Sequence, residues 1–422
     1  MLLDLVGIGI GPFNLSLAAL AARVDGLAAR FLEREPEFRW HPGLLIEGTT
    51  LQVPFLADLV TLVDPTHPLS FLAYLRDRGR LFPFYFAERF HIPRAEYDDY
   101  CRWAARQLPS CVFDQEVHEV QWSAEDNAFA VRSGTDTLLA RNVVLGVGTE
   151  PIVPEPLAGF AYHSADYLSV RDRLVDLDDV TVVGSGQSGA EVFLDLLRRR
   201  GRGLRWITRT PAFAPMEYSR LGLEQFTPDY ARYFHGLPEP VRDRLVPTQW
   251  QLYKGISAET IAEIHDELYR LTIGGQWPEV TLAPGVAVVG ARADGDRVEL
   301  TVRHEQQQAT ATVRTSAVVC ATGYAERDLE ALVGPLAGPR DDAGRITVDA
   351  DFRVGLRPGI TGSVFVQNAE RHTHGVGAPD LGLAAWRAAT ILNAVCGRAV
   401  HPLPDRTAYT TFGLARERWR TT

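Results

Sequence analysis

Two stretches of the chain repeat one pattern, in which a short apolar run ends at closely spaced glycines and leads directly into a helix. The first apolar run covers residues 4–8, and the second covers residues 180–183. A buried strand, a tight glycine turn and a helix N-terminus together form the pyrophosphate-binding unit of Rossmann-like folds. The sequence therefore predicts an α/β protein with two dinucleotide-binding domains.

The first glycine turn has the spacing G-x-G-x-x-N. A glycine allows the sharp turn, a second one lets the backbone approach the phosphates, and an asparagine stands where the common fingerprint has a third glycine. An acid follows the next apolar run, about twenty residues past the glycines, where a carboxylate accepts the ribose hydroxyls. The residues expected to bind this first dinucleotide are Gly9, Gly11, Pro12, Asn14 and Glu33.

The second glycine turn has the full spacing G-x-G-x-x-G. Its candidate residues are Gly184, Gly186, Gln187, Ser188 and Gly189. The next apolar run, 204–209, ends in Arg209 and has no acid at the position that would hold a free ribose hydroxyl. Because a guanidinium suits a 2′-phosphate, this half is expected to prefer NADPH over NADH.

Helical spacing predicts two helices between the glycine turns. The first opens at Ser70, with Phe71, Leu72 and Leu75 on its inner face. The second has Pro93 as its first residue, and its buried face is expected to carry Tyr97, Tyr100, Cys101, Ala104 and Leu108. A β-rich segment follows at 112–147.

After the second turn, residues 215–273 become helical and polar, with a helix start at Ser257, and strands resume at 280–282, 286–289, 298–302 and 311–313. The buried run 317–320 is expected to return the chain to the first domain. A strand at 363–366 and a helix from 381 to 395 follow. We therefore expect a first dinucleotide-binding domain in two parts (1–165 and 316–422), an NADPH domain in two parts (166–215 and 276–315) and a helical substrate insert (216–275).

Composition narrows the class of protein. The 422 residues carry a formal net charge of −10 and no basic block, which argues against nucleic-acid binding and mildly favours a cationic small substrate. The four cysteines of the chain have neither metal-ligand nor C-x-x-C spacing, so we expect reduced thiols and no metal site. Scattered reduced thiols are typical of a cytoplasmic protein, which is the location we expect. No signal peptide or membrane span is expected. Lys254 is the only lysine.

Further motifs bring in a family resemblance. Residues 159–167 resemble the linker fingerprint G-x-x-x-H-x-x-x-Y of NADPH-dependent flavin monooxygenases, with Leu157 at its leading aromatic position. Motifs spread over the whole chain together resemble the N-hydroxylating monooxygenases of siderophore biosynthesis; they are Gly9 to Leu15, Trp40-His41, Gln52 to Leu59, Gly186 to Gly189, Ala321 to Tyr324 and Thr373 to Gly375. The residue before Ala321 departs from the family's usual leucine or phenylalanine.

The resemblance implies that a terminal primary amine is hydroxylated with FAD, NADPH and O2, through a flavin C4a-hydroperoxide. It implies no acid–base catalytic residue, because the flavin carries the chemistry, and it implies a homotetramer. Trp40, His41, Gln52, Thr322 and Gly323 are the implied FAD contacts. The helix that begins near Leu381 is expected to direct its dipole at the flavin ring.

Ala57 is the departure that bears on the substrate. Family members that act on ornithine or lysine usually carry a lysine at this position, which holds the substrate carboxylate. The methyl group of Ala57 removes that partner, so the sequence favours a diamine, cadaverine or putrescine, with Asp380 or Glu217 pairing with its ammonium end. Gln52 is a further substrate candidate, and Lys254 is a candidate that would instead suit a carboxylate.

Three alternatives stay open at this point. The first is an L-lysine N6- or L-ornithine N5-monooxygenase, and the second is another NADPH-dependent flavin monooxygenase. The third is a nucleotide-binding regulator without turnover.

Overall fold

The computed structural model describes residues 2–414, and its first sheet has seven strands. The strand order is β3-β2-β1-β6-β5-β4, and β17 also pairs with β6. The strands are β1 (Leu2–Ile8), β2 (Ala29–Leu32), β3 (Cys111–Val112), β4 (Val117–Ser123), β5 (Ala128–Ser133), β6 (Asp136–Leu145) and β17 (Ser363–Val366). Because β1 lies parallel to both β2 and β6 at the centre of the sheet, the first glycine turn opens at the carboxyl end of the sheet.

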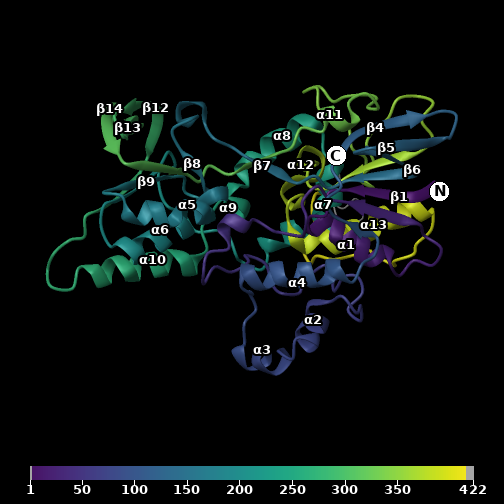
Figure 1. Cartoon of the computed structure of the whole chain (residues 1–422), viewed down its shortest axis with the longest axis horizontal. Coiled ribbons are helices and arrows are strands. Elements are labelled where there is room, and N and C mark those ends of the chain that lie inside the picture. The colour runs from purple at the N-terminus through teal and green to yellow at the C-terminus, as the bar shows by residue number, and fades with distance from the viewer. Residues whose placement is uncertain (1, 415–422) are drawn as a thin grey trace.

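Helices cover this sheet. Helix α1 (Pro12–Ala21) is buried at every position because all its residues are apolar or small, and it packs against α13 (Ala384–Cys396) (Figure 1). The other helices of this half are α2 (Phe71–Asp77), α3 (Leu81–Ala87), α4 (Arg94–Arg106), α11 (Glu330–Val333) and α12 (Arg371–His374).

The second sheet is wholly parallel, in the order β11-β10-β9-β15-β8. Its strands are β8 (Tyr162–His163), β9 (Val180–Val183), β10 (Leu204–Thr208), β11 (Val280–Pro284) and β15 (Ala317–Cys320). Three antiparallel strands, β12 (Val286–Asp294), β13 (Arg297–His304) and β14 (Ala309–Thr315), form a separate small sheet. The helices of this half include α5 (Tyr167–Asp176) and α6 (Gln187–Arg200).

The two sheets confirm the expected α/β fold with two Rossmann-like units. Two expected placements are wrong. β8 lies inside the range expected for the first domain, 1–165, but belongs to the second sheet, where it pairs with β15. β15 does not return the chain to the first unit but pairs with β9 at the centre of the second sheet. The reason is that its four buried apolar residues need cover on both faces, which a central parallel strand provides. The return to the first unit follows at β16 (Tyr324–Glu326), which pairs antiparallel with β7 (Thr149–Pro151).

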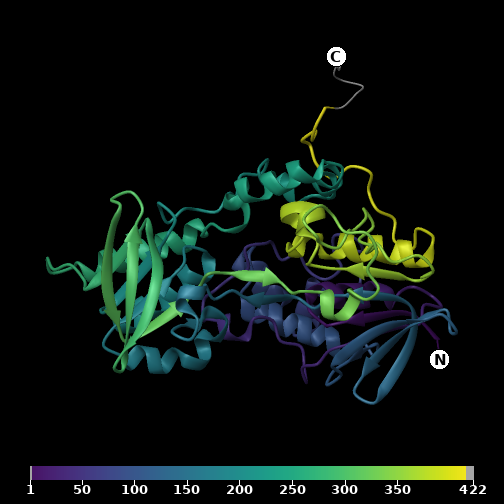
Figure 2. The same ribbon diagram turned by 90° about the horizontal axis from the view of Figure 1, so that it is seen from above.

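Figures 1 and 2 show the two units side by side, joined by crossing segments. The helical segment expected at 216–275 contains α7 (Pro228–His235), α8 (Glu239–Thr248), α9 (Trp250–Tyr253) and α10 (Ala258–Leu271). Helix α10 packs on α6 and connects β10 to β11, so it is a crossover helix of the second unit. Helices α7 and α8 instead contact α12 of the first unit.

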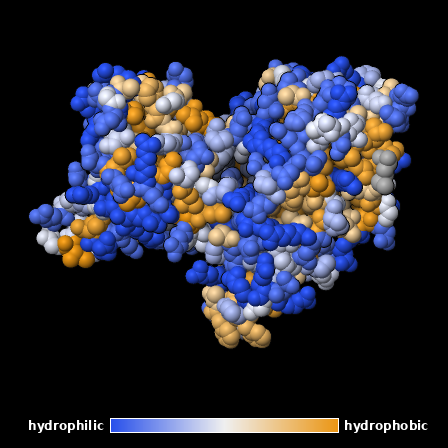
Figure 3. Space-filling view, in the orientation of Figure 1, coloured by the Kyte–Doolittle hydropathy of each residue, from blue (hydrophilic) through white to orange (hydrophobic). Residues whose placement is uncertain are grey.

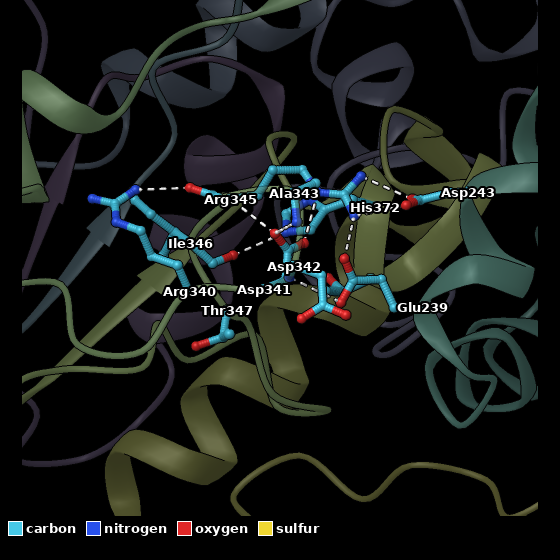
Figure 4. Close-up of polar contacts among 12 residues, drawn as sticks. Glu239, Asp243, Arg340, Asp341, Asp342, Ala343, Arg345, Ile346, Thr347 and His372 are labelled. Atoms are coloured by element: carbon cyan, nitrogen blue, oxygen red, sulfur yellow. Dashed lines mark hydrogen bonds and ion pairs between the residues drawn. The ribbon is translucent and has the colours of Figure 1, made fainter.

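Arg345 anchors the helical segment to the first unit (Figure 4). Its guanidinium lies 2.8 Å from Asp243 and 3.3 Å from Glu239, both on α8, and 2.6 Å from Asp341 on its own loop. Burial lowers the pKa of Arg345, but the hydrogen bonds and charges of Asp243 and Asp341 outweigh it and raise this pKa above its ordinary value. His372 adds a hydrogen bond of 2.9 Å to the carbonyl of Ile346. The segment is therefore held at a fixed position against the first unit.

The two helices expected from Ser70 and Pro93 are confirmed as α2 and α4. The side chain of Ser70 caps α2, and the buried face of α4 contains the expected residues Tyr97, Tyr100, Cys101 and Ala104. Pro93 is the N-cap of α4 rather than its first residue, and Leu108 is buried but lies beyond the helix end. Leu72 was wrongly expected on the inner face, because it points outward beside α3, a short aromatic helix that periodicity did not predict. An orange patch at the bottom of Figure 3 lies where Figure 1 labels α3.

Among residues 2–414, no helix is long and apolar enough to cross a membrane.

Candidate functional site

The first glycine turn has the geometry that an anion site needs. Gly9 has φ +85°, and a Cβ added there would lie 2.5 Å from the carbonyl oxygen of Gly146. The next glycine, Gly11, is the N-cap of α1, and no side chain caps this helix end. A Cβ at Gly11 would meet only that same carbonyl oxygen, at 4.0 Å. The backbone N–H groups at the start of α1 therefore face open space that fits a pyrophosphate.

Asn14 shapes this turn from inside. It is fully buried, its side-chain amide donates to the carbonyls of Ile8 (3.1 Å) and Gly9 (2.8 Å), and its oxygen accepts from Gln367. These bonds direct Asn14 to the protein backbone, so its expected contact with the dinucleotide is indirect.

Glu33 lies directly after β2 and reaches the same turn. Its carboxylate accepts from the N–H of Ile10 at 2.7 Å. An acid at the end of the second strand and beside the glycine turn is where a Rossmann fold holds a ribose. The residues of this half therefore fit FAD.

Trp40 and His41 follow Glu33 in a loop that is fixed by hydrogen bonds and ring contacts. The N–H of Trp40 donates to Asp98 at 2.7 Å, and His41 adopts a left-handed backbone with φ 47°. The imidazole ring packs edge-on against Trp40 and against Tyr324. Burial, with the positive charge of Arg94, lowers the pKa of His41 to about 4, so its ring is neutral at physiological pH.

Thr322 and Gly323 meet the linker histidine. Gly323 has φ +90° with open space at its Cβ position, and its carbonyl accepts a hydrogen bond of 3.2 Å from His163. The hydroxyl of Thr322 donates to the carbonyl of Ile152 at 2.5 Å. The linker fingerprint therefore ties the second sheet to the turn after β15. Leu381 begins the short helix η6 (Leu381–Leu383) that precedes α13.

The second glycine turn repeats the geometry of the first. Gly184 has φ +124°, and a Cβ there would lie 2.2 Å from the carbonyl oxygen of Ala321. A Cβ at Gly189 would lie 2.5 Å from the carbonyl oxygen of Gly184, so a side chain there would push α6 away from β9. Gly186 caps α6 without a side-chain bond. Ser188 is the second residue of α6, and this helix end also fits a pyrophosphate.

The Gln187 side chain is occupied within the protein. Its nitrogen donates to Glu191 (2.9 Å) and Thr260 (3.0 Å), and its oxygen accepts from the N–H of Ser257 (2.7 Å). Gln187 therefore joins the start of α6 to the start of α10, and only its backbone is available to a dinucleotide.

The single lysine lies beside this second turn. The carbonyl oxygen of Lys254 is 3.8 Å from the Cβ position at Gly186, and its ammonium lies over the ring of Tyr253. Burial and the nearby charges of Arg371 and Arg209 lower the pKa of Lys254. Three cations thus gather beside the turn expected to hold NADPH.

Ala57 and Asp380 meet around Gly382. A Cβ at Gly382 would lie 4.0 Å from the Ala57 methyl group and 2.8 Å from Asp380 Oδ1, which accepts the N–H of Gly382 at 2.7 Å. Ala57 is buried, and burial raises the pKa of Asp380 to about 6. Two candidate residues that are distant in sequence are therefore neighbours: a methyl group and a carboxylate.

Tyr218 was missed by the sequence reasoning and belongs to this group. Its hydroxyl lies 3.5 Å from the carbonyl oxygen of Gln52. Burial, then the charges of Glu259 and Asp380, raise the pKa of Tyr218 to about 12, so it is a neutral hydrogen-bonding group. The neighbouring Glu217 is exposed, and its carboxylate accepts from the N–H of Ser219 in its own loop. Its expected role in substrate binding stays a prediction.

A buried ion pair joins the two units at the centre of these candidates. Arg94 at the start of α4 lies 2.8 Å from Glu191 on α6, with side chains 9% and 4% exposed. Arg94 also donates to the carbonyl of Thr50 (3.2 Å) and to Gln52 Oε1 (3.4 Å). The loop that carries Gln52 and Ala57 is thereby tied to the helix that begins at the second glycine turn.

Neither member of this pair stands out in the sequence. One signal was available, because a cation in the first turn of a helix is unfavourable against the helix dipole and so needs another partner. That partner is 97 positions away, and only the fold brings it close.

We expect Glu191→Gln to destabilise the protein by about 3–5 kcal/mol, because it leaves the buried Arg94 charge without a counter-ion. The free energy of unfolding in urea measures this loss. The matched control is Glu263→Gln. This change removes an exposed ion pair with Arg198, which lies on α6 as Glu191 does, and should cost less than about 1 kcal/mol. Equal losses for the two variants would contradict the central place given to Arg94 and Glu191.

Comparison with known sequences gives one family. The family described as L-lysine 6-monooxygenase/L-ornithine 5-monooxygenase matches residues 1–326. A rhizobactin siderophore biosynthesis protein of Rhizobium meliloti is 47% identical, with 97% of this chain and 95% of that protein covered. A putrescine N-hydroxylase of Shewanella oneidensis is 42% identical, with 97% and 84% covered.

Comparison with solved structures agrees with this result. The FAD-bound cadaverine monooxygenase of the desferrioxamine biosynthetic pathway of Erwinia amylovora superimposes with a TM-score of 0.93 at 37% identity. The comparison covers 98% of this chain and 99% of that one. The whole arrangement of sheets and crossing segments is therefore shared.

Proposed function

Because this chain belongs to the L-lysine 6-monooxygenase/L-ornithine 5-monooxygenase family, we propose that it N-hydroxylates one terminal amine of cadaverine or putrescine for hydroxamate siderophore biosynthesis. The chain is an NADPH-dependent flavoprotein N-monooxygenase. Bound FAD, once reduced, supplies the activated oxygen from O2. The chain's own residues bind and orient the amine and keep water away.

The position of Ala57 beside the Gly382–Asp380 turn carries the choice of a diamine. A diamine has two basic nitrogens and no carboxylate, so it needs an anion at its distal end and no cation. Asp380 offers that anion, and the methyl group of Ala57 offers an apolar wall. The carboxylate of lysine or ornithine would instead lie beside Asp380, a like charge, without a partner at position 57.

The two amines of the substrate must differ in charge: Asp380 needs an ammonium at the distal end, whereas the reaction needs a neutral amine at the other end. An aliphatic amine has a pKa near 10.4, so only about one molecule in a thousand is neutral near pH 7.5. Burial favours the neutral form of the reacting amine, because a charged group loses its hydration there. Only the neutral form has the free lone pair that reacts with the activated oxygen. Asp380, ionised above about pH 6, holds the distal nitrogen as an ammonium. The two ends of one symmetrical molecule are thereby distinguished by their surroundings.

Nucleotide binding is divided between the two glycine turns in this proposal. The turn of Gly9 and Gly11 would hold the pyrophosphate of FAD, Glu33 would hold its ribose, and the loops of His41, Gln52 and Thr322 would contact its ring. The turn of Gly184 to Gly189 would hold NADPH. Arg209 and Lys254 supply positive charge for its phosphates, which assigns the single lysine to the cofactor rather than to a substrate carboxylate.

The wider organisation follows the same proposal. The expected domain division is kept with two changes, since β8 and β15 belong to the NADPH unit. The protein assembles as a homo-oligomer, a tetramer by resemblance to the family, and works in the cytoplasm, in keeping with its four free cysteines.

The proposal is tested by the hydroxylamine formed per NADPH consumed by the FAD-loaded protein, with cadaverine, putrescine, lysine and ornithine in parallel. We expect a ratio near one for a diamine and uncoupled NADPH oxidation with the two amino acids. Coupling with lysine or ornithine would instead support the alternative of an amino-acid N-monooxygenase. Coupling with none of the four would support the wider class of NADPH flavin monooxygenases.

The pH dependence of diamine binding tests the role of Asp380. Protonation of this carboxyl below about pH 6 removes the charge that holds the ammonium, so KM for the diamine should rise as the pH falls from 7 to 5. Asp380→Asn should raise KM about tenfold or more at pH 7.5 and flatten the profile. The control Glu217→Gln, in an exposed loop, should leave the profile unchanged. A pH-dependent KM that survives in Asp380→Asn would contradict this role.

A further inference from the structure

Helix α3 and the loop after it carry four large aromatic side chains on the outside of the molecule. Phe82, Tyr85, Phe86 and Phe90 are 77%, 71%, 75% and 54% exposed. Figure 3 shows an apolar patch at the bottom of the molecule, where Figure 1 labels α3, and Figure 1 shows α3 extending away from the sheets. A groove of ≈ 600 Å³ runs along this face and is lined by three of these aromatics, Phe82, Tyr85 and Phe90; its other lining residues are Phe55, Leu72, Leu81, Phe84, Glu88 and Arg89. We call these ten residues the α3 face.

The exposed area is large for a surface that faces water. A fully covered aromatic side chain buries about 150–250 Å², so the four aromatics leave roughly 550 Å² of apolar surface exposed. Covering this area on two copies would bury about 1,100 Å², and the leucines and charged rim bring the total into the range of about 1,200–2,000 Å² for specific interfaces. The α3 face is therefore of the size that a dimer contact needs, whereas surface aromatics of a monomer are normally scattered.

The charges at the groove are complementary to themselves. Glu88 and Arg89 are adjacent, exposed and opposite in sign, and neither has an ion-pair partner in the part of the chain that the structure describes. A two-fold axis places residue i of one copy against residue j of the other, and j against i. Glu88 of one copy then faces Arg89 of the other copy, twice in one interface.

We propose that the α3 face is the surface on which a second copy of this chain packs across a two-fold axis. This inference stands apart from the proposed reaction and depends only on the aromatic area and the paired charges.

A second copy on the α3 face would also affect the loop that carries Ala57. The ring of Phe55 packs edge-on against Phe84 and Phe90. The backbone N–H of Phe55 also donates to the backbone carbonyl of Phe90, at 2.9 Å. Covering the α3 face therefore supports the backbone two residues before Ala57.

Light scattering coupled to gel filtration tests the interface on the FAD-loaded full chain at tens of micromolar. The test variant is Phe82→Asp/Phe86→Asp, which places charge in the middle of the α3 face. The matched control is Trp277→Asp, a 90% exposed aromatic in the second unit. We expect the assembly to fall to half its size or less in the test variant and to keep its size in the control. A monomeric wild type, or an unchanged assembly in the test variant, would overturn the proposal.

Charge exchange provides the sharper test, because it removes no apolar surface. Glu88→Arg and Arg89→Glu each create two like-charge contacts and should each weaken self-association about tenfold or more, as measured by sedimentation. The double variant, Glu88→Arg/Arg89→Glu, restores two opposite pairs and should recover the wild-type constant. Failure of the double variant to recover association would overturn the two-fold arrangement. Flotation of a monomeric wild type with phosphatidylglycerol vesicles would also overturn it, in favour of a membrane surface.

Discussion

The buried ion pair between Arg94 and Glu191 is the interaction on which the arrangement of the site depends. Two charges removed from water are tolerated only when each stays against the other and their remaining polar atoms are bonded. Arg94 meets this demand by also holding Thr50 and Gln52, while Glu191 is held by Gln187. The loop that carries Gln52 and Ala57 in one unit and the start of α6 in the other are thus held together by four side chains. They are Gln52, Arg94, Gln187 and Glu191.

This constraint bears on the proposed reaction, in which no residue of the chain is expected to act as an acid or base. Bound FAD would supply the oxygen chemistry, so the protein's part is geometric: the amine, the flavin and the nicotinamide must meet at one place. In this proposal, Asp380 and Ala57 select the amine at one side, and the cations Arg209, Lys254 and Arg371 favour a phosphate-bearing dinucleotide at the other. The linker contact between His163 and Gly323 and the Arg345 anchor of α8 keep the same parts in register.

The sequence was sufficient for the features that local physics determines. Both glycine turns, the acid Glu33, the capped helix at Ser257 and the buried face of α4 follow from spacing, capping and periodicity, and the structure contains each of them. The association of Ala57 with Asp380 could be suggested only through family resemblance, because the two residues are 323 positions apart and only the fold brings them together. Local signals also failed where tertiary packing decides. The sequence of β15 suggested a strand that returns to the first unit, but β15 lies in the second sheet, and α3 is a short aromatic helix that periodicity did not predict.

The central claim is that the methyl group of Ala57, beside Asp380, selects a diamine. The most direct measurement is the ratio of kcat/KM for cadaverine to that for lysine in the wild type and in Ala57→Lys, with FAD content and Tm checked for both. The account predicts that the added ammonium lowers kcat/KM for cadaverine by about 10–100-fold, through like charge in the pocket, and raises it for lysine. An unchanged or improved rate with cadaverine in Ala57→Lys would contradict the account.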